Sequence, residues 1–599
     1  RSNITGLMNE LGVGSYQDFH AWSVQNRTSF FELMVNRLNI RFGKPFETVV
    51  ELSRGAESPQ WLPGAKLNIA DSCFSAPKDS PAIVSKSEKT SLSTLTYGEL
   101  DSLSNRVANS LVETGFTPGD SIAVDMPMTS ESVAVYLGII KAGCTVVSVA
   151  DSFAPHEIET RLKIANTKAI FTQDYISRGG KRLPLYEKVI ASGAPKAIVL
   201  SSDGEETLPL NLRSGDMTWG QCLSDCDEFN SVACDPHGHT NILFSSGTTG
   251  TPKAIPWTHT TPIKCAIDAY LHHDIKSGDV LAWPTNLGWM MGPWLIYASL
   301  INKGTIALYD GLPTEREFGE FVQDAGVTML GVVPSLVRAW KNTECMKGLD
   351  WRKIKAFSST GECSNREDML FLMSLAEYRP IIEYCGGTEI GGGFITGTLV
   401  QPAAPATFST PALGSDLVIL DAEGEHTDNG EVFLIPPSMG LSTELLKDDH
   451  YGVYFEGNPT LPDTAPLRRH GDQIERLAGG FFRAHGRVDD TMNLGGIKVS
   501  SAEIEQVLNT VSGVRETAAV AVSPKDGGPS QLIIHAVLLT EANPDETSLK
   551  PELQEAIREQ LNPLFKIRDV VIRDSLPRTA SNKIMRRLLR DESTTKPNA

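Results

Sequence analysis

The sequence predicts an α/β fold with two parts. A large N-terminal domain is expected to contain doubly wound, mainly parallel sheets plus a small β-rich subdomain, and a small mobile α+β domain follows it. The chain has 599 residues, too many for one hydrophobic core. From about residue 80, β-rich runs alternate with helical patterns, as in β-α-β units. After Gly486 this alternation gives way to a compact unit with a different pattern.

The first part of the chain divides into an extension and the large domain. Residues 1–75 contain scattered aromatic side chains and are expected to pack as an extension on the large domain, which spans 76–487. Within it, 121–127 is typical of a strand, 132–142 has apolar spacing that suits a helix, and 145–150 is typical of a second strand. This succession predicts a parallel sheet covered by helices.

The same alternation recurs further along the large domain. Strands are predicted at 280–283, 305–308 and 327–333. Between 411 and 455 the pattern changes to short strands separated by turn signals such as Asp428-Asn-Gly. This change predicts the small β-rich subdomain.

The small C-terminal domain is predicted to span 488–599. Ser500-Ser-Ala-Glu503 has the form of a capping box that opens a helix. Strands are expected at 517–522 and 532–539, and a helix around 553–561. These elements together predict a compact α+β unit.

The overall charge and apolar content exclude some classes of partner. The net charge of −19 argues against nucleic acid or an anionic membrane as partner. A site for an anion must therefore concentrate its basic residues locally. The most apolar long stretch, 287–301, is too short to cross a bilayer and is expected to be core, so no membrane span is predicted.

Cysteine spacing and the chain ends bear on the compartment. Nine cysteines include no Cys-x-x-Cys pair, which favours reduced thiols over a disulfide framework or a zinc site. The chain begins at Arg1 without a signal-peptide pattern, so we expect an incomplete N-terminus. Its end, Lys596-Pro-Asn-Ala599, is unlike a terminal peroxisomal signal. A cytoplasmic or peroxisomal location is expected.

The segment Phe244-Ser-Ser-Gly-Thr-Thr-Gly-Thr-Pro-Lys253 carries the strongest chemical signal. Glycines allow the backbone to approach an anion closely, successive N–H groups can surround phosphate oxygens, and hydroxyls add donors. Lys253 adds a positive charge. Two residues separate Gly247 from Gly250, so the segment is not a Walker loop. By composition alone, a flexible Ser/Gly loop is the alternative.

Six further motifs accompany this loop in a fixed order. They are Thr96-Tyr-Gly-Glu-Leu100, Ser359-Thr-Gly-Glu362, Gly386-Gly-Thr-Glu389, His470-Gly-Asp472, Gly486-Arg-Val-Asp-Asp490 and Leu576-Pro-Arg-Thr-Ala-Ser-Asn-Lys583. With these motifs the chain resembles the adenylate-forming superfamily of acyl-CoA synthetases, luciferases and peptide-synthetase adenylation domains. The segments 245–257 and 286–294 look most like plant acyl-activating enzymes of the acetyl-CoA-synthetase-like branch.

The resemblance implies an ATP-dependent, AMP-forming acid–CoA ligase. Such an enzyme would activate a short- to medium-chain carboxylic acid as an acyl adenylate and pass the acyl group to CoA, with ATP, Mg²⁺ and CoA required. Alternatives are another acyl acceptor, an aryl or longer fatty acid, or a catalytically silent nucleotide-binding protein. We expect a monomer or homodimer that binds small molecules and no nucleic acid.

The resemblance also implies roles for individual residues. Lys583, Glu389 and Thr248 would be catalytic, with Glu389 also the metal ligand. Asp489 would be the interdomain hinge, and Gly495 and Gly496 would contact CoA. Residues expected to bind ATP or AMP are Ser245, Ser246, Gly247, Thr249, Gly250, Lys253, Gly361, Glu362, Cys385, Gly386, Gly387, Thr388, Asp472, Arg487 and Lys498. For Arg487, an ion pair with Asp489 or Asp490 is the structural alternative.

Departures from the family pattern bear on the acid. Cys385 occupies the position where an aromatic ring usually stacks on adenine, and it remains a plausible apolar wall. Acetate-specific relatives carry a tryptophan where this chain has Gly386, so we expect room for several more carbons. Trp289, Met290 and Met291 match acyl-pocket positions, although methionine more often simply fills a core.

Overall fold

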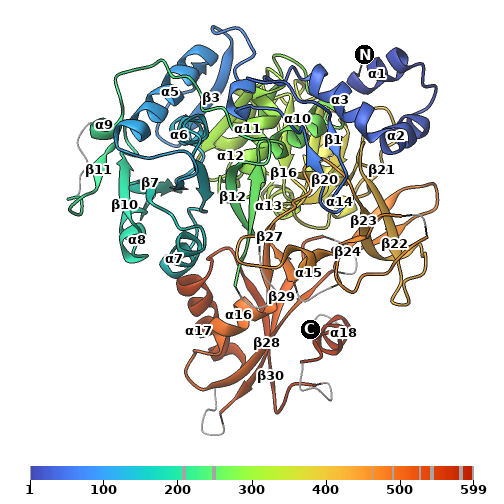
Figure 1. The fold of residues 1–599 in the computed structure, drawn as a ribbon. Helices are drawn as coiled ribbons and strands as arrows, with labels where there is room; N and C mark the ends of the chain where they lie inside the picture. Colours follow the sequence, from blue (N-terminus) through green and yellow to red (C-terminus); the bar gives the residue numbers. More distant parts are fainter. Residues whose placement is uncertain are drawn as a thin grey trace.

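The computed structural model shows a large body with a smaller unit attached at one side (Figure 1). The structure describes residues 2–204, 211–245, 251–462, 464–488, 491–524, 528–539, 546–578 and 584–595. The predicted fold class is confirmed: parallel sheets with helices form the large N-terminal part, and a small α+β domain follows.

The N-terminal extension forms three helices, α1 (Asn3–Leu11), α2 (Tyr16–Gln25) and α3 (Arg27–Arg37), and a short ribbon of β1 (Val50–Glu51) with β2 (Gln60–Trp61). Its aromatic side chains, including those of Phe30 and Phe31, are buried in the main hydrophobic cluster of the large domain. The extension is thus packed on the large domain.

The first large sheet contains seven described strands, in the order β11-β10-β7-β5-β6-β12-β13. All described pairings are parallel except that of β12 with β13. Helix α5 (Tyr97–Glu113) and helix α6 (Ser130–Lys141) pack together beside it. The strands are β5 (Ser121–Asp125), β6 (Thr145–Ser148), β7 (Ala169–Gln173), β10 (Lys196–Leu200), β11 (Met217–Thr218), β12 (His239–Ser245) and β13 (Lys253–Thr258).

The second large sheet also contains seven described strands, in the order β18-β17-β16-β14-β15-β3-β4. Only the pairing of β3 with β4 is antiparallel among its described strands. Helix α11 (Met291–Leu300), which contains most of the predicted apolar core stretch, is almost entirely buried. The strands are β3 (Pro81–Ser87), β4 (Ser93–Thr96), β14 (Val280–Ala282), β15 (Thr305–Asp310), β16 (Met329–Val332), β17 (Ala356–Ser359) and β18 (Ile381–Glu383).

Further helices of the large domain lie around these two sheets. They are α4 (Ile69–Ser72), α7 (Pro155–Ile164), α8 (Tyr186–Ala191), α9 (Trp219–Cys222), α10 (Thr261–Leu271), α12 (Arg316–Asp324), α13 (Pro334–Thr343), α14 (Arg366–Ser374) and α15 (His450–Tyr454). A hairpin of β8 (Tyr175–Arg178) and β9 (Lys181–Pro184) extends beyond the first sheet.

The β-rich region consists of two small antiparallel sheets. One contains β19 (Cys385–Gly387), β20 (Gly392–Thr396) and β21 (Thr410–Pro411). The other contains β22 (Asp416–Leu420), β23 (Asn429–Ile435), β24 (Arg468–Arg476) and β25 (Phe482–Arg487). This confirms the predicted change of pattern after 411.

The small domain begins with a hairpin of β26 (Thr491–Leu494) and β27 (Ile497–Ser500). Helix α16 (Ser501–Leu508) opens with the predicted capping box, in which the side chains of Ser500 and Glu503 each accept a hydrogen bond from the other's backbone N–H. A sheet of β28 (Val514–Val522), β29 (Gln531–Leu538) and β30 (Ile567–Arg573) packs with α17 (Glu546–Gln560) and α18 (Arg586–Thr595).

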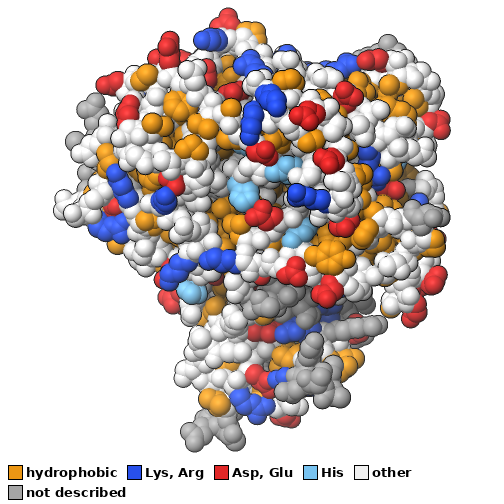
Figure 2. All heavy atoms as spheres, viewed as in Figure 1, with side chains coloured by type: hydrophobic (Ala, Val, Ile, Leu, Met, Phe, Trp, Pro, Cys, Tyr) orange, Lys and Arg blue, Asp and Glu red, His pale blue; other side chains and the backbone are white. Residues whose placement is uncertain are grey.

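Among the described residues, no helix combines the length and apolarity needed to cross a bilayer. All nine cysteines lie in the described part of the chain and have free thiols. On the face shown in Figure 2, basic side chains are scattered among acidic and apolar ones.

Candidate functional site

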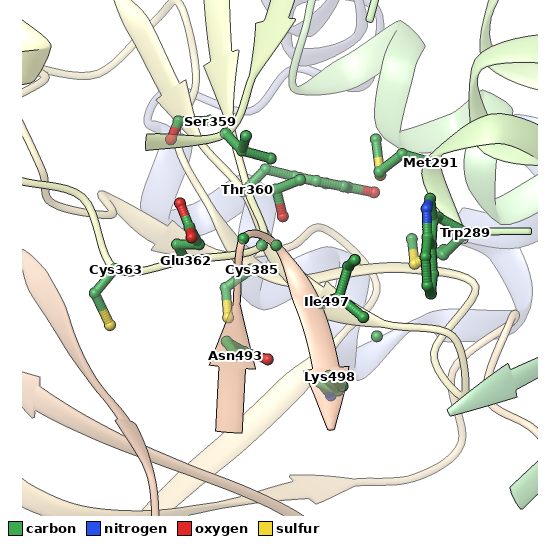
Figure 3. Close-up of a pocket in the computed structure, with 18 of the residues that line it drawn as sticks. Trp289, Met291, Ser359, Thr360, Glu362, Cys363, Cys385, Asn493, Ile497 and Lys498 are labelled. Carbon is green, nitrogen blue, oxygen red and sulfur yellow. The ribbon is translucent and has the colours of Figure 1, made fainter. Parts of the chain in front are cut away.

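A cavity of about 330 Å³ lies where the large domain meets the hairpin β26–β27 of the small domain. Its walls come from the end of β12, the segments that follow β14 and β17, strand β19, strand β24 and the hairpin itself. Figure 3 shows Glu362 and Cys363 on one side and Trp289 and Met291 on the other, with the hairpin entering between them. The cavity therefore brings the carboxyl ends of parallel strands together with the small domain, a usual place for ligands in α/β folds.

Glu389 forms the centre of a charged cluster that reaches the polar end of the cavity through Lys498 and Asp472. Its side chain is 6% exposed, and its Oε1 lies 3.8 Å from both Lys498 Nζ and His470 Nδ1. Burial alone would raise the pKa of Glu389, but Lys498, His470 and Lys253 together hold it well below its usual range. Glu389 is therefore ionised and surrounded by positive charge.

Asp472 continues this cluster through His470. His470 Nε2 lies 3.0 Å from Asp472 Oδ2, and Arg487 donates to Asp472 Oδ1 at 3.1 Å. Burial would raise the pKa of Asp472, but His470, Arg487 and Lys498 hold it well below its usual range. Asp472 therefore keeps its negative charge and can accept hydrogen bonds. Arg487 forms an ion pair with Asp472, while Asp489 and Asp490 lie outside the described residues.

The donor set at Glu389 fits one Mg²⁺ ion that is shared with a bound phosphate. Glu389 Oε2 is buried and has no hydrogen-bond partner among the described residues. Mg²⁺ commonly takes one or two protein carboxylates and completes its shell with phosphate oxygens and water. No group of three or more potential ligand side chains occurs in the described part of the chain, so a site made by protein alone is not found there.

The opposite end of the cavity is apolar. Trp283, Met290, Met291 and Tyr384 line it. Tyr384 is fixed at its hydroxyl, which donates to Asp268 Oδ2 at 2.6 Å and accepts from Trp294 Nε1 at 3.1 Å. This end offers shape and apolar surface, as an aliphatic chain would require.

Trp283 is held in a fixed position at this end by two contacts. A Cβ atom on Gly331 would lie 1.9 Å from the Trp283 ring, so the indole rests directly on this glycine. Its ring also meets that of Trp294 edge to face, with centroids 5.6 Å apart. Trp283 therefore forms a rigid wall.

Trp289 contacts both domains. Its ring lies 5.2 Å from that of Phe153 in an edge-to-face arrangement. It also packs against the hydrophobic core of the small domain. Trp289 borders the cavity and is also part of the interface between the domains, and its place in an acyl pocket stays a prediction.

The explanation that we gave for Gly386 needs correction. Gly386 borders the cavity, but a Cβ atom there would lie 1.8 Å from the carbonyl oxygen of Gly392. The space beside its Cα is therefore filled by the backbone of β20, and a side chain would collide with this strand. The glycine permits close pairing of β19 with β20.

A second, larger cavity of about 720 Å³ adjoins the first. The two share the lining segment 283–286 and Leu564 of the small domain. The second cavity is lined mainly by apolar side chains, and Arg178, Lys188 and Arg558 also border it. The two cavities are therefore neighbours with a common wall.

The first cavity collects most of the described residues that the motifs predicted. Its lining includes Ser245, Gly361, Glu362, Cys385, Gly386, Gly387, Thr388, Asp472, Gly495, Gly496 and Lys498. Lys253, at the start of β13, lies close enough to Glu389 to lower its pKa. Predicted residues outside the described part of the chain are Ser246, Gly247, Thr248, Thr249, Gly250, Asp489 and Lys583.

Sequence reasoning assigned no role to Trp283, Tyr384 or Asn493, which also line the cavity, and named His470 only as part of a motif. Trp283 directly follows β14, a parallel strand. Because ligands bind at the carboxyl ends of such strands, the position of Trp283 in the sequence could have predicted that it lines the site. No comparable signal in the sequence marks the role of His470 between Glu389 and Asp472.

Models of known families match most of the chain. The AMP-binding enzyme model matches residues 70–439, and the AMP-binding enzyme C-terminal domain model matches 503–583. The model of the acetyl-coenzyme A synthetase N-terminus matches 16–73.

Individual proteins are similar over nearly the whole chain. "Probable acyl-activating enzyme 17, peroxisomal" of Arabidopsis thaliana is 49% identical over 97% of this chain and 84% of its own length. "Hexanoyl-CoA synthase" of Cannabis sativa is 46% identical, with the same coverage of both chains. The solved acetoacetyl-CoA synthetase from Streptomyces lividans matches with a TM-score of 0.77 at 24% identity, over 100% of this chain and 94% of that one, which shows a shared fold. The chain belongs to the AMP-binding enzyme family.

Proposed function

We propose how this chain, an ATP-dependent, AMP-forming acid–CoA ligase, divides its reaction between the two ends of its cavity. The polar end would hold the nucleotide and the reacting phosphate. The apolar end would hold a short- to medium-chain acid. The observation that carries this proposal is that one cavity is lined by Asp472 and Lys498, which belong to the charged cluster around Glu389 and His470, and by the apolar wall of Trp283, Met290, Met291 and Tyr384.

The first half-reaction would be adenylation. A carboxylate resists nucleophilic attack because an oxide is a poor leaving group. Here a carboxylate oxygen of the acid attacks the α-phosphorus of ATP, the bond to the β-phosphate oxygen breaks, and pyrophosphate leaves. Lys253 and Lys583 are the basic residues proposed to stabilise the charge that develops at the α-phosphate. Asp472 would accept hydrogen bonds from the ribose hydroxyls.

Mg²⁺ is required by this family and would be held by Glu389 together with phosphate oxygens. When bound, it would neutralise phosphate charge during pyrophosphate release. The orphan oxygen Oε2 of Glu389 supports this assignment.

In the second half-reaction, the CoA thiolate would attack the acyl carbonyl carbon and AMP would leave. We assign the pantetheine arm of CoA to the second cavity, because this cavity is largely apolar and shares the lining residues 283–286 and Leu564 with the first. Leu564→Trp should therefore raise the KM for CoA more than the KM for ATP.

A covalent enzyme intermediate on cysteine is disfavoured. Cys363 and Cys385 both line the cavity, but burial raises the pKa of Cys363 to about 12 and that of Cys385 well above its usual value. The thiolate is the nucleophilic form, so neither residue is activated at neutral pH.

A panel of acids tests the proposed substrate class. The purified protein would be supplied with ATP, Mg²⁺, CoA and straight-chain acids from about two to twelve carbons, plus aryl acids. Each methylene group that the site buries should contribute about 0.8 kcal/mol to binding, so the chain-length series should show where the preference ends. Pyrophosphate release and acyl-CoA formation would be measured separately. We expect both activities to be highest for chains longer than acetate. Pyrophosphate release without acyl-CoA would indicate another acceptor, and neither product with any acid would indicate a silent nucleotide-binding protein.

Two related plant proteins carry "peroxisomal" in their names, and on this support we place the enzyme in the peroxisome. Fluorescence microscopy of the full-length tagged protein beside a peroxisomal marker tests this location. A diffuse cytoplasmic signal would contradict it.

A further inference from the structure

The loop that follows β17 touches the tip of the small-domain hairpin through glycines on both sides. A Cβ atom on Gly361 would lie 3.1 Å from Cα of Gly496. A Cβ atom on Gly496 would lie 3.1 Å from Cγ1 of Val333. Both glycines have positive φ, +89° and +81°. The two backbones are therefore in direct contact, and neither could carry a side chain without strain.

Glu362, the next residue in the loop, places its carboxylate beside this contact. The backbone N–H of Ser335, in the first turn of α13, donates to Glu362 Oε2 at 2.8 Å. The other oxygen, Oε1, is buried and has no hydrogen-bond partner among the described residues. One half of the carboxylate is thus anchored to the large domain and the other half is available.

The N–H groups of the hairpin tip are the donors that face this carboxylate. Burial raises the pKa of Glu362, while the amides of Ser335, Gly496 and Gly495 oppose that rise. Gly495 and Gly496 both have positive φ and form the two-residue turn between the paired residues Leu494 and Ile497, which places their N–H groups at the tip. A carboxylate oxygen is the complementary acceptor, and such charge-assisted hydrogen bonds are stronger than neutral ones.

We propose that Glu362 is a positioning residue that captures the Gly495–Gly496 tip and so selects the domain orientation in which the hairpin closes the cavity. This role rests on the proposed function, because it assigns the captured orientation to the second half-reaction. The proposal differs from the nucleotide-binding role that the family resemblance implies for Glu362.

The physical basis is an exchange of partners at one buried oxygen. With the tip docked, the amides of Gly495 and Gly496 favour the charged carboxylate and partly compensate its desolvation. When the small domain rotates away, water can reach this oxygen through the open cavity. The stabilisation by the tip amides therefore contributes only to the docked orientation, which is what a selective contact requires.

Three variants test the proposal. Glu362→Ala removes the acceptor, and Glu362→Gln keeps one oxygen but removes the charge. Glu383→Gln is the matched control, because Glu383 is a second glutamate of the same cavity whose described hydrogen bond goes to Ser364 within the large domain. Thermal unfolding confirms that each variant is folded before it is used.

The first readout is hydrogen exchange of the segment 493–499, followed by mass spectrometry of the whole protein with and without AMP. We expect Glu362→Ala to speed exchange in this segment by about fivefold or more, which corresponds to a loss of roughly 1 kcal/mol in the free energy of docking. The exchange rate of Glu362→Gln should lie between those of Glu362→Ala and the wild type. Glu383→Gln should leave this segment unchanged. Exchange that is equal in all four proteins would overturn the contact.

The second readout is the ratio of two half-reaction rates: pyrophosphate release with acid and ATP, and acyl-CoA formation from supplied acyl adenylate. Glu362→Ala should lower the second relative to the first by about tenfold, equivalent to roughly 1.4 kcal/mol. An unchanged ratio would overturn the selective role. If the wild type forms no acyl-CoA with any acid, the proposed function fails, while the exchange experiment still decides whether Glu362 holds the tip.

Discussion

The two ends of the cavity are built in opposite ways. At the polar end, Glu389, His470, Asp472 and Arg487 lie within 4 Å of their neighbours, and each has a charged partner. At the apolar end, Trp283, Met290 and Met291 have no charge and contribute only shape. At the polar end, activity should change when a single atom of a charged side chain is replaced. At the apolar end, the preference among acids should change with the volume of the side chains. The polar end would determine which reaction is catalysed, and the apolar end would determine which acid is selected.

The largest expected effect concerns Lys583, which lies outside the described residues. If it serves the polar end during adenylation only, Lys583→Ala should lower acid-dependent pyrophosphate release by on the order of a thousandfold, because charge on the α-phosphate loses a stabilising partner. Acyl-CoA formation from supplied acyl adenylate should fall far less. Lys583→Arg, which keeps the charge, is the control. Equal losses in both half-reactions would contradict the division of labour.

Glu383 sharpens the comparison because it is a carboxyl group of the cavity without a cation. Burial raises its pKa to about 7, despite hydrogen bonds from Ser364 and Ser359. The native state therefore binds a proton more tightly than the unfolded state, and its contribution to stability is lost as pH rises from about 4.5 through 7.

Glu383→Gln should remove this loss. Relative to the wild type, the variant should gain roughly 2–3 kcal/mol between pH 4.5 and pH 8, measured from denaturant midpoints across that range. Glu389 has the opposite shift, so Glu389→Gln should show no such gain as pH rises. A gain that does not depend on pH would contradict the assignment to Glu383.

Asp472 tests the polar end by a change of almost no volume. Asp472→Asn removes the charge that His470 and Arg487 surround and should lower kcat/KM for ATP by about a hundredfold, since hydrogen bonds to charged groups contribute roughly 1.5–3 kcal/mol. The selectivity among acids should remain as in the wild type. Steady-state kinetics with two acids measure both quantities. A changed acid preference would show that the two ends are not independent.

The smallest effect is expected at the apolar end. Met291→Trp should fill volume beside Trp289 and lower the preference for a six-carbon acid over acetate by about tenfold, since each buried methylene contributes roughly 0.8 kcal/mol. Met291→Leu conserves volume and is the control. The measurement is kcat/KM for each acid. Folded Met291→Trp with an unchanged chain-length profile would remove Met291 from the acyl site.

Local sequence features predicted much of the fold correctly. The alternation of strands and helices between 121 and 150 predicted β5, α6 and β6, and the Ser500–Glu503 capping box predicted the start of α16. Such features depend on residues a few positions apart, so the sequence alone expresses them. The motifs likewise indicated the correct family, because they are short and their order is fixed.

Contacts between distant residues could not be predicted in this way. The sequence suggested that Gly386 leaves empty space, and the structure shows the backbone of β20 there. It suggested that Trp289 belongs to the acyl pocket, and only the tertiary structure shows that the same ring packs on the small-domain core. These outcomes depend on which strand or domain faces a residue.

By itself, the sequence determined the order of secondary-structure elements, the family and the residue types available for chemistry. The tertiary structure decided that His470 lies between Glu389 and Asp472, that Trp283 rests on Gly331, and that Gly361 meets Gly496. The physical reason is that secondary structure follows from local backbone preferences and apolar periodicity, whereas each of these contacts requires distant segments to pack in one arrangement.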